Sequence, residues 1–417
     1  MRSDIMKSFA PTPKQLDFIN MELGVFMHYG IRTFNEVHRD WDMKPMDLST
    51  FNPTEQDCRK WIKQLKDIGV KYTVLTSKHH DGFALWQTEQ TEFSVKNTPY
   101  KNGKGDVIKE YVDACHEFGM FCGIYYSCSQ FDTESRTGEE YDDFVVAQLT
   151  ELLSNYGKID YLWFDGCGSE GHTFDAERIE KTVRTLQPEI IVNGSWGDDI
   201  RWSGNEWGVI KLNNQNRKDG KTGFYPGECD CCVVRNQWEN FWFYNETHKD
   251  CIRTPEEMLG IYYHTIGKGA NLLINIGPDR RGLLPEKNLE LLGYMTSEMK
   301  RRLEDCRIPS SDVIKDEEKY FIRFDEYSLV DHVVLEEDIS DGGHIEAFDI
   351  CVSETTNQSV NVPIYRGFTV GHKMVCTFPP IRAKNIVVKI AAKDGEEKLD
   401  KIYACYVSGK DKIFQIY

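Results

Sequence analysis

Short apolar runs that end in polar or aromatic residues recur along the first part of the chain. They cover Gly24–Gly30, Tyr72–Thr76, Phe121–Ser127 and Tyr161–Gly166. Runs of this length are typical of buried strands. Catalytic residues of α/β barrels sit at the C-terminal ends of such strands. The pattern therefore predicts several strands that direct polar side chains toward one rim.

Segments with helical periodicity separate these strands. Trp61, Leu65 and Ile68 lie on one face of the first predicted helix, which ends at Gly69, a suitable left-handed terminator. The predicted helices are Asp57–Gly69, Val107–Gly119, Tyr141–Gly157, Asp175–Gln187, Pro255–Gly269 and Pro285–Cys306, and Ile190–Asn193 and Asn271–Asn275 are further strands. This alternation has the length of one (β/α)₈ barrel.

An open doubly wound sheet is the main rival to the barrel. That fold would require a Gly-x-Gly-x-x-Gly fingerprint after its first strand. Here the first strand ends in His28-Tyr29-Gly30. The predicted fold class is therefore α/β, a (β/α)₈ TIM-like barrel.

The character of the chain changes after Cys306. Short β-like runs separated by turn residues follow, at Tyr320–Phe324, His332–Leu335, Ile345–Ile350, Lys373–Phe378 and Asn385–Ile390. This spacing predicts a C-terminal antiparallel β-sandwich. We place the domains at residues 1–306 for the barrel and 307–417 for the sandwich.

Charge and composition narrow the class of partner. A net charge of −17 disfavours nucleic acid and anionic membranes, and leaves neutral ligands such as sugars open. The N-terminal residues lack an apolar signal region, and no apolar stretch approaches the ~20 residues that span a bilayer. We expect a soluble cytoplasmic protein, although a periplasmic or secreted protein whose signal had been removed would look the same.

Thirteen cysteines are scattered through the predicted strands and helices. An odd number suits buried reduced thiols better than a disulfide framework. Cys229-Asp230-Cys231-Cys232 resembles part of a zinc site, but structural zinc sites usually combine two separated cysteine pairs. We therefore expect free thiols there and no bound metal.

The tandem histidines His79 and His80 allow three interpretations. They could be core residues, metal ligands or hydrogen-bonding partners of a polar substrate. His28 ends another strand, and the proposed rim is rich in aromatic residues: Trp41, Tyr125, Tyr126, Trp163, Trp202, Trp207, Trp238 and Trp242. Aromatic rings for the apolar face of a sugar, with polar groups for its hydroxyls, predict a sugar pocket.

Glycoside hydrolysis requires two carboxyl groups, which retaining enzymes hold about 5–5.5 Å apart. Asp165 ends an apolar strand, where a carboxylate is costly unless it faces a polar cavity, so it is the candidate nucleophile. Glu206 and Glu228 are candidate acid/bases, both predicted on loops past the fifth strand. Asp81 and Glu36 are further candidates, although either could instead hold a histidine or an arginine in place.

The chain resembles the α-L-fucosidases of glycoside hydrolase family 29 over nearly its whole length. The resemblance rests on Phe26–Gly30, Phe51–Pro53, Leu75–Phe83, Ser94–Pro99, Lys101–Val107 and Trp163–Gly166. The stretch from Ser94 to Val107 is most similar to the subfamily selective for α-1,3- and α-1,4-linked fucose in Lewis-type glycans. The C-terminal segments Val333–Ile339 and Thr369–Lys373 are similar to the sandwich of that family.

This resemblance implies roles for individual residues. Asp165 matches the family nucleophile, and Glu206 lies in a Gly-Asn-Glu segment that resembles the acid/base loop, which favours it over Glu228. Where the family often has Glu-Trp, this chain reads Asp40-Trp41. The expected substrate-binding residues are His28, Trp41, His79, His80, Tyr126, Trp163, Glu228 and Trp238.

The resemblance and the residues together predict a retaining exo-α-L-fucosidase that needs no metal or organic cofactor. Its partner is a fucosylated oligosaccharide or glycoconjugate, and its oligomeric state stays open. One alternative is a fucose-binding barrel protein with weak or no catalysis. The other is a metal-dependent barrel hydrolase that uses His79, His80 and Asp81.

Overall fold

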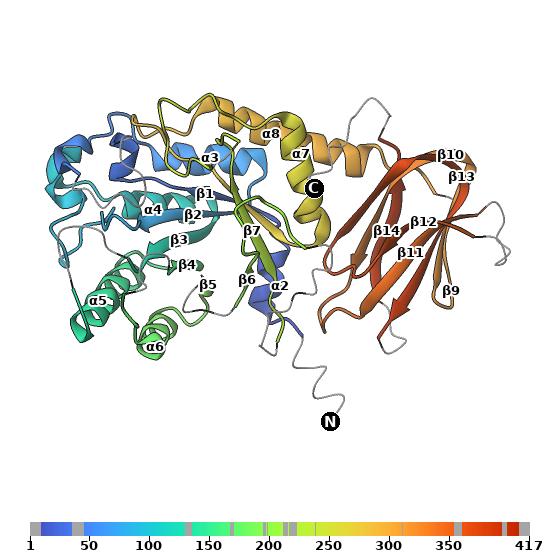
Figure 1. Ribbon diagram of the computed structural model, residues 1–417, viewed down its shortest axis with the longest axis horizontal. Helices are drawn as coiled ribbons and strands as arrows, with labels where there is room; N and C mark the ends of the chain where they lie inside the picture. The colour runs from blue at the N-terminus through green and yellow to red at the C-terminus, as the bar shows by residue number, and fades with distance from the viewer. Residues whose placement is uncertain are drawn as a thin grey trace.

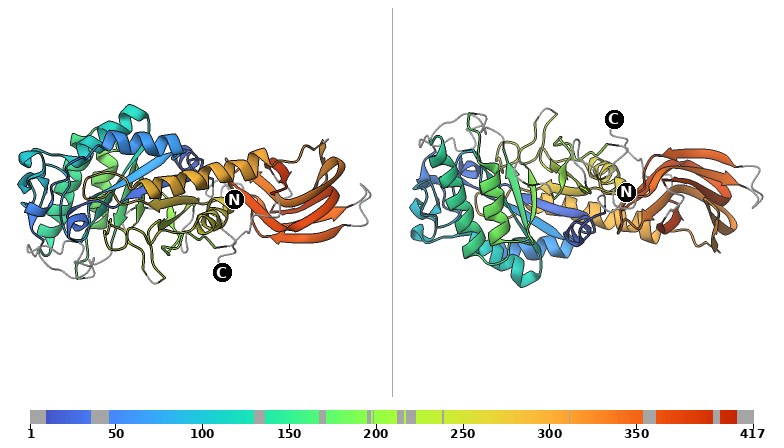
Figure 2. Two further views of the ribbon diagram at one scale, coloured as in Figure 1. Left: turned by 90° about the horizontal axis from the view of Figure 1, so that it is seen from above. Right: turned by 90° about the horizontal axis from the view of Figure 1, so that it is seen from below.

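The computed structural model describes residues 10–35, 46–129, 136–166, 171–194, 197, 199–211, 216, 223–237, 239–310, 312–353, 361–393 and 398–407. They form a barrel surrounded by helices and an all-β part, which lie side by side along the long axis of the molecule (Figure 1; Figure 2). No helix in these ranges is long and apolar enough to cross a membrane.

Eight parallel strands form the barrel, which confirms the predicted fold class. They follow one another around it in the order β5-β4-β3-β2-β1-β8-β7-β6. Their bounds are β1 Leu23–Met27, β2 Tyr72–Lys78, β3 Phe121–Ser127, β4 Tyr161–Asp165, β5 Ile191–Gly194, β6 Arg201–Trp202, β7 Gly227–Cys232 and β8 Asn271–Asn275. The sequence predicted all of them except β6 and β7.

Helices cover the outside of the barrel. α3 and α4 begin where Asp57 and Asp106 accept hydrogen bonds from the backbone N–H groups of Lys60 and Lys109, and both end at a left-handed glycine. The α-helices are α2 Pro13–Ile19, α3 Cys58–Ile68, α4 Val107–Phe118, α5 Glu139–Asn155, α6 Ala176–Leu186, α7 Pro255–His264 and α8 Glu286–Lys300. The 3₁₀ turns are η1 Ile31–Phe34, η2 Leu48–Thr50, η3 Val95–Asn97, η4 Tyr100–Gly103 and η5 Ile266–Lys268, and η6 Arg301–Asp305 is a π-helical turn.

Helix α2 closes the N-terminal end of the barrel. The Phe18 ring lies 5.4 Å from the Tyr72 ring and 5.5 Å from the Tyr161 ring, between centroids. Asn271 Nδ2 donates a hydrogen bond to the Phe18 carbonyl oxygen at 2.7 Å. A Cβ on Gly24 would lie 2.3 Å from Tyr72 Cζ, so glycine is required where the Tyr72 ring enters the interior. The opposite end of the barrel stays open.

The C-terminal part is one antiparallel sheet in the order β12-β11-β13-β10-β14, with β9 paired to β10. β9 pairs with the first residues of β10 and β14 pairs with its last residues, and register shifts between Arg323 and Ser328 and between Val330 and His332 separate these regions. This arrangement is consistent with a β-sandwich. The bounds are β9 Asp312–Asp316, β10 Lys319–Glu337, β11 Ile345–Ser353, β12 Val362–Gly367, β13 Met374–Ala392 and β14 Leu399–Cys405.

Buried polar contacts join the barrel to the sheet. Glu22, just before β1, accepts a hydrogen bond from His372 Nε2 at 3.0 Å and pairs with Lys373. Burial alone would raise the pKa of Glu22, but His372 and Lys373 outweigh it and lower the pKa from 4.5 to about 2. On α7, the hydroxyl of Tyr263 lies 2.8 Å from Nε2 of His332 on β10.

The Glu22 contact generates a prediction about acid stability. Because its pKa is lower in the folded chain, Glu22 stabilises the fold above pH 4.5, and this contribution is lost as the pH falls toward 2. We expect Glu22→Gln to lower the free energy of unfolding by about 3 kcal/mol at pH 7, measured by urea denaturation. The difference from wild type should shrink below pH 4.5. A difference that is independent of pH would contradict the assignment, and Asp67→Asn in the exposed Lys63–Asp67 pair should have little effect.

Candidate active site

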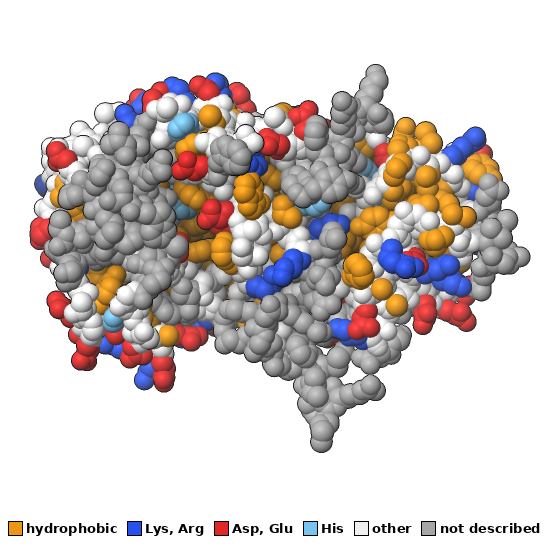
Figure 3. Space-filling model, in the orientation of Figure 1, with side chains coloured by type: hydrophobic (Ala, Val, Ile, Leu, Met, Phe, Trp, Pro, Cys, Tyr) orange, Lys and Arg blue, Asp and Glu red, His pale blue; other side chains and the backbone are white. Residues whose placement is uncertain are grey.

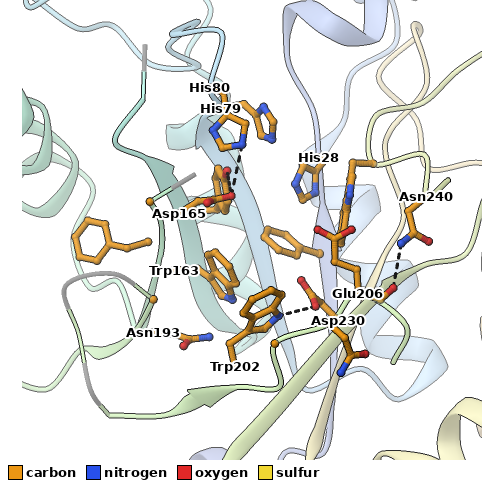
Figure 4. Close-up of a pocket in the computed structure, with 18 of the residues that line it drawn as sticks. His28, His79, His80, Trp163, Asp165, Asn193, Trp202, Glu206, Asp230 and Asn240 are labelled. Atoms are coloured by element: carbon orange, nitrogen blue, oxygen red, sulfur yellow. Dashed lines mark hydrogen bonds and ion pairs between the residues drawn. The ribbon is translucent and has the colours of Figure 1, made fainter. Parts of the chain in front are cut away.

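A cavity of about 1200 Å³ opens at the C-terminal ends of the barrel strands. Small-ligand pockets usually measure about 300–1,000 Å³, so this cavity has room for more than one sugar ring. In the orientation of Figure 1, acidic, histidine and hydrophobic side chains gather on this part of the barrel (Figure 3). Asp165, His79 and His80 lie on one side of the cavity, and Glu206, Asp230 and Asn240 lie on the other (Figure 4).

Asp165 ends β4 and points into the cavity with its side chain one quarter exposed. Tyr125 Oη donates a hydrogen bond to Asp165 Oδ2 at 2.8 Å. His80 Nε2 lies 3.6 Å from the same oxygen. The main-chain carbonyl of Asp165 accepts from the backbone N–H of Cys128, which fixes the end of the strand. This carboxylate is therefore held by its neighbours and still open to a ligand.

Glu206 follows β6 on a loop and is exposed at the mouth of the cavity. The surrounding protein raises the pKa of Glu206, and the Asp165 carboxylate adds to this effect, while hydrogen bonds from Asn240 and Trp242 oppose it. Asn240 Nδ2 also donates to the Glu206 main-chain carbonyl at 3.0 Å. Glu206 is therefore a carboxyl at the mouth that holds its proton more tightly than a free glutamate does.

Three buried histidines line the cavity opposite Glu206. Burial lowers the pKa of His28 and of His80 to about 3, and it lowers the pKa of His79 well below its usual value. All three imidazoles are therefore neutral at pH 7. Neutral imidazoles accept and donate hydrogen bonds, which suits sugar hydroxyls.

The hydrogen bonds of the histidines fix which ring nitrogens face the cavity. Asn275 Nδ2 donates to the Trp242 carbonyl, so its Oδ1 accepts from His28 Nδ1 at 2.9 Å and leaves His28 Nε2 as an acceptor. His80 Nδ1 lies 2.6 Å from Ser127 Oγ, which leaves its Nε2 toward Asp165. His79 Nδ1 is buried and has no hydrogen-bond partner among the described residues. A bound hydroxyl would satisfy such a group.

Tyr126, which the sequence predicted to bind substrate, does not line the cavity. Its hydroxyl donates to Gln148 Oε1 on α5 at 2.8 Å, and Lys78 Nζ lies 4.7 Å from its ring centroid. Neighbouring residues of a strand point to opposite faces. Tyr125 is the inward residue of the pair, and it stacks on both His79 and Trp163.

Glu228 lies within β7 and not on a loop, which corrects the prediction. Its side chain is completely buried beneath the cavity. Burial raises the pKa of Glu228, and hydrogen bonds from Tyr161, Tyr72, Trp163 and Asn193 offset only part of this rise, so the pKa is about 7. The carboxyl group therefore has no direct access to a ligand in the cavity, while Trp163 lines it as predicted.

Asp230 was not among the predicted site residues. It lies two positions after Glu228 on the inward face of β7, lines the cavity and accepts a hydrogen bond from Trp202 Nε1 at 2.8 Å. Burial raises the pKa of Asp230 well above its usual value, and the charges of Glu206 and Glu228 act in the same direction. The alternation of Glu228, Asp230 and Cys232 with Cys229 and Cys231 was a strand signal in the sequence.

Several other residues line the cavity, although no specific role in the site was assigned to them from the sequence. Asn193 lies in β5, Trp202 belongs to β6, and Trp207 and Trp242 come from the loops after β6 and β7. Arg235 packs on the Trp207 ring with its guanidinium carbon 4.4 Å from the centroid. The predicted residues Trp41, Trp238 and Glu36 lie outside the described residues.

Two sets of residues considered for metal binding are occupied by other interactions. Asp81 Oδ2 accepts from Arg32 Nε at 2.9 Å and its Oδ1 accepts from the Phe83 N–H at 2.7 Å, so Asp81 holds an arginine, one of the roles left open by the sequence. Cys229, Cys231 and Cys232 are buried in β7 on alternating faces. Among the described residues, no group of three or more His, Cys, Asp or Glu side chains is arranged to hold a metal ion.

Comparisons with known proteins place this chain in a family. The family model described as alpha-L-fucosidase matches residues 6–304. Alpha-L-fucosidase 1 of Arabidopsis thaliana is 33% identical over 319 residues, which cover 70% of this chain and 60% of that protein. A crystal structure of a putative alpha-L-fucosidase from Bacteroides ovatus is similar at 31% identity and a TM-score of 0.83, over 95% of this chain and 74% of that one. A crystal structure of a putative alpha-L-fucosidase from Bacteroides thetaiotaomicron is similar at 27% identity and a TM-score of 0.85, over 96% of this chain and 98% of that one.

The buried carboxyl of Glu228 generates a prediction about stability and pH. Because its pKa is raised from 4.5 to about 7 in the folded chain, the folded state holds this proton more tightly than the unfolded state, and the resulting stability is lost as the pH rises from 4.5 to 7. We expect the free energy of unfolding of Glu228→Gln to rise by about 3 kcal/mol relative to that of wild type as the pH goes from 4 to 8, measured by chemical denaturation. A constant difference across this range would mean that Glu228 titrates normally.

Proposed function

The chain belongs to the α-L-fucosidase family, and we propose that it is a retaining exo-α-L-fucosidase that releases terminal α-linked L-fucose from oligosaccharides or glycoconjugates. Asp165 is the proposed nucleophile and Glu206 the proposed acid/base. The matched part of the chain spans about 60% of the Arabidopsis relative, so the activity of that protein is extended to this chain as part of the proposal.

One observation carries the proposal: two carboxyl groups in different environments face one sugar-sized cavity from different sides (Figure 4). Asp165 receives a hydrogen bond from Tyr125, which favours the carboxylate form of a nucleophile. The raised pKa of Glu206 favours the protonated form that a general acid requires. Such a division of roles is what double displacement at a glycosidic carbon needs.

The proposed reaction has two displacements. Asp165 attacks the anomeric carbon of fucose, and the bond to the departing oxygen breaks as Glu206 donates its proton to that oxygen. Glu206, now a carboxylate, then removes a proton from water, and the resulting hydroxide equivalent displaces Asp165 from the fucosyl-enzyme ester. Two inversions give net retention, and no oxidant, metal or organic cofactor takes part.

The neutral histidines support the recognition of fucose hydroxyls. His28, His79 and His80 lie within one cluster, with ring centroids 5.4 Å apart for His28 and His79 and 4.1 Å apart for His79 and His80. Each is held by aromatic or polar neighbours, so little rotational freedom is lost when a sugar binds. Trp163 adds an aromatic surface beside them.

The far side of the cavity supports a preference for branched glycans. Trp202 and Trp207 expose their indoles at the mouth next to Glu206, where the sugar that carries the fucose would lie. Together with the Lewis-type resemblance of Ser94–Val107, this wall favours α-1,3- and α-1,4-linked fucose. Contacts with the neighbouring sugar can then lower the transition-state energy.

The nucleophile is tested by Asp165→Ala. We expect a folded protein whose turnover of an aryl fucoside falls by several orders of magnitude, on the order of 10⁴-fold or more, because the covalent step is lost. Added azide should partly restore turnover and give fucosyl azide of inverted, β configuration. Tyr126→Phe, which alters a tyrosine outside the cavity, serves as the control. Near-normal activity of Asp165→Ala would remove Asp165 from the mechanism.

The acid/base is tested by comparing leaving groups. Protonation matters most for a poor leaving group, so Glu206→Ala should reduce kcat/KM far more on fucosylated disaccharides than on nitrophenyl fucoside. Glu228→Ala should give losses that depend little on the leaving group. If the two patterns were exchanged, Glu228 would be the acid/base.

The linkage preference is tested with free oligosaccharides. We expect a higher kcat/KM on α-1,3/1,4-fucosylated lactosamine trisaccharides than on 2′-fucosyllactose, with only modest activity on aryl fucosides. The measurement is fucose release at low substrate concentration. Equal kcat/KM on the two linkage types would refute the preference and leave the fucosidase activity untouched.

A further inference from the structure

Four side-chain donors converge on the buried carboxylate of Glu228. Its Oε2 accepts hydrogen bonds from Tyr161 Oη at 2.7 Å, Trp163 Nε1 at 3.1 Å and Asn193 Nδ2 at 3.3 Å. Its Oε1 accepts from Tyr72 Oη at 2.9 Å. The donors belong to β2, β4 and β5, whereas Glu228 belongs to β7. The carboxylate therefore joins strands across the interior of the barrel.

The four donors form two layers. Tyr72 and Tyr161 lie at the beginnings of their strands, where both rings pack against Phe18 of the closing helix α2. Trp163 and Asn193 lie nearer the open end, and their side chains form part of the cavity wall (Figure 4). Glu228 thus connects the closed end of the barrel to the wall that faces the ligand.

A hydrocarbon side chain at position 228 would leave the indole N–H of Trp163 and the amide of Asn193 without this acceptor. Buried polar groups without partners are costly, and Trp163 and Asn193 would reorient to find others. A charged acceptor also makes shorter and stronger hydrogen bonds than a neutral one. Trp163 is constrained on its other side by Tyr125, whose ring is stacked with it at 5.7 Å.

We infer that Glu228 is a positioning residue, whose carboxylate holds Trp163 and Asn193 in the orientation that places fucose against Asp165. The inference rests on the proposed fucosidase function. Glu228 acts through Trp163 and Asn193 because it is completely buried and does not line the cavity. It is neither the proton donor nor a ligand of the sugar.

The test uses Glu228→Gln, which keeps the shape and one oxygen acceptor but removes the charge. We expect kcat/KM on nitrophenyl fucoside to fall about 10-fold at pH 8, because above the Glu228 pKa of about 7 the wild-type side chain is mainly a carboxylate and small displacements of a positioning group are costly to turnover. Tyr111→Phe is the matched control, since the Tyr111 hydroxyl is equally buried but bonds to Thr73 Oγ1 and the Gly123 carbonyl, away from the cavity. It should stay within about twofold of wild type.

A double-mutant cycle with Trp163→Phe separates positioning from a general structural effect. Trp163→Phe keeps an aromatic ring in the cavity wall but removes the indole N–H that donates a hydrogen bond to Glu228. If Glu228 acts through Trp163 and Asn193, Glu228→Gln should cause a clearly smaller loss in the Trp163→Phe background than in wild type, because only its contact with Asn193 remains to be lost. Losses that multiply would overturn the inference, as would a Glu228→Gln enzyme within twofold of wild type. Absence of fucoside hydrolysis by the wild type would instead refute the proposed function.

Discussion

Exclusion of water at the open end of the barrel governs the ionisable groups described there. Parallel strands deliver histidines and carboxyls to a cavity where burial penalises charge, so His28, His79 and His80 are neutral and the carboxyl of Asp230 holds its proton more tightly than in water. The same penalty acts on Glu228 beneath the cavity. Hydrogen-bond donors act in the opposite direction where they are aimed at an oxygen. The balance between burial and hydrogen-bond donors decides how tightly each carboxyl holds its proton.

Asp165 and Glu228 show this balance in two positions. Asp165 is partly open and receives the Tyr125 hydroxyl, so its remaining surface faces the cavity. The Glu228 side chain is completely buried, and its four hydrogen-bond partners are donors from other strands. The same side-chain chemistry therefore serves as a reactive group in one place and as a support for the cavity wall in the other. Phe18 of helix α2 packs against Tyr72 and Tyr161, two of the residues that hydrogen-bond to Glu228.

The sequence predicted the features that local patterns encode. Apolar runs located most barrel strands, glycines located the C-terminal ends of α3 and α4, and polar residues after strands brought His28, His79, His80 and Asp165 to one cavity. Tyr125 and Tyr126 could not be told apart, because β3 is buried on both faces and gives no alternation signal.

Strand β7 was not predicted, although its acidic residues alternate with cysteines. Its sequence Gly-Glu-Cys-Asp-Cys-Cys is polar for a barrel strand. What makes Glu228 acceptable there is a set of donors from β2, β4 and β5, which are far away in the sequence. The position of Glu206 was available from its loop and the family resemblance. Its raised pKa was not, because it depends on burial by the surrounding protein and on the Asp165 charge, which outweigh the hydrogen bonds from Asn240 and Trp242.

The proposed mechanism requires that Asp165 becomes covalently attached to fucose. A 2-deoxy-2-fluoro-fucosyl fluoride slows the breakdown of a fucosyl-enzyme more than its formation, so incubation followed by proteolysis and peptide mass spectrometry should locate the attached sugar. We expect one fluorofucosyl group on the peptide that contains Asp165. Attachment to Glu206, Asp230 or Glu228, or turnover with inversion and no attached sugar, would contradict it.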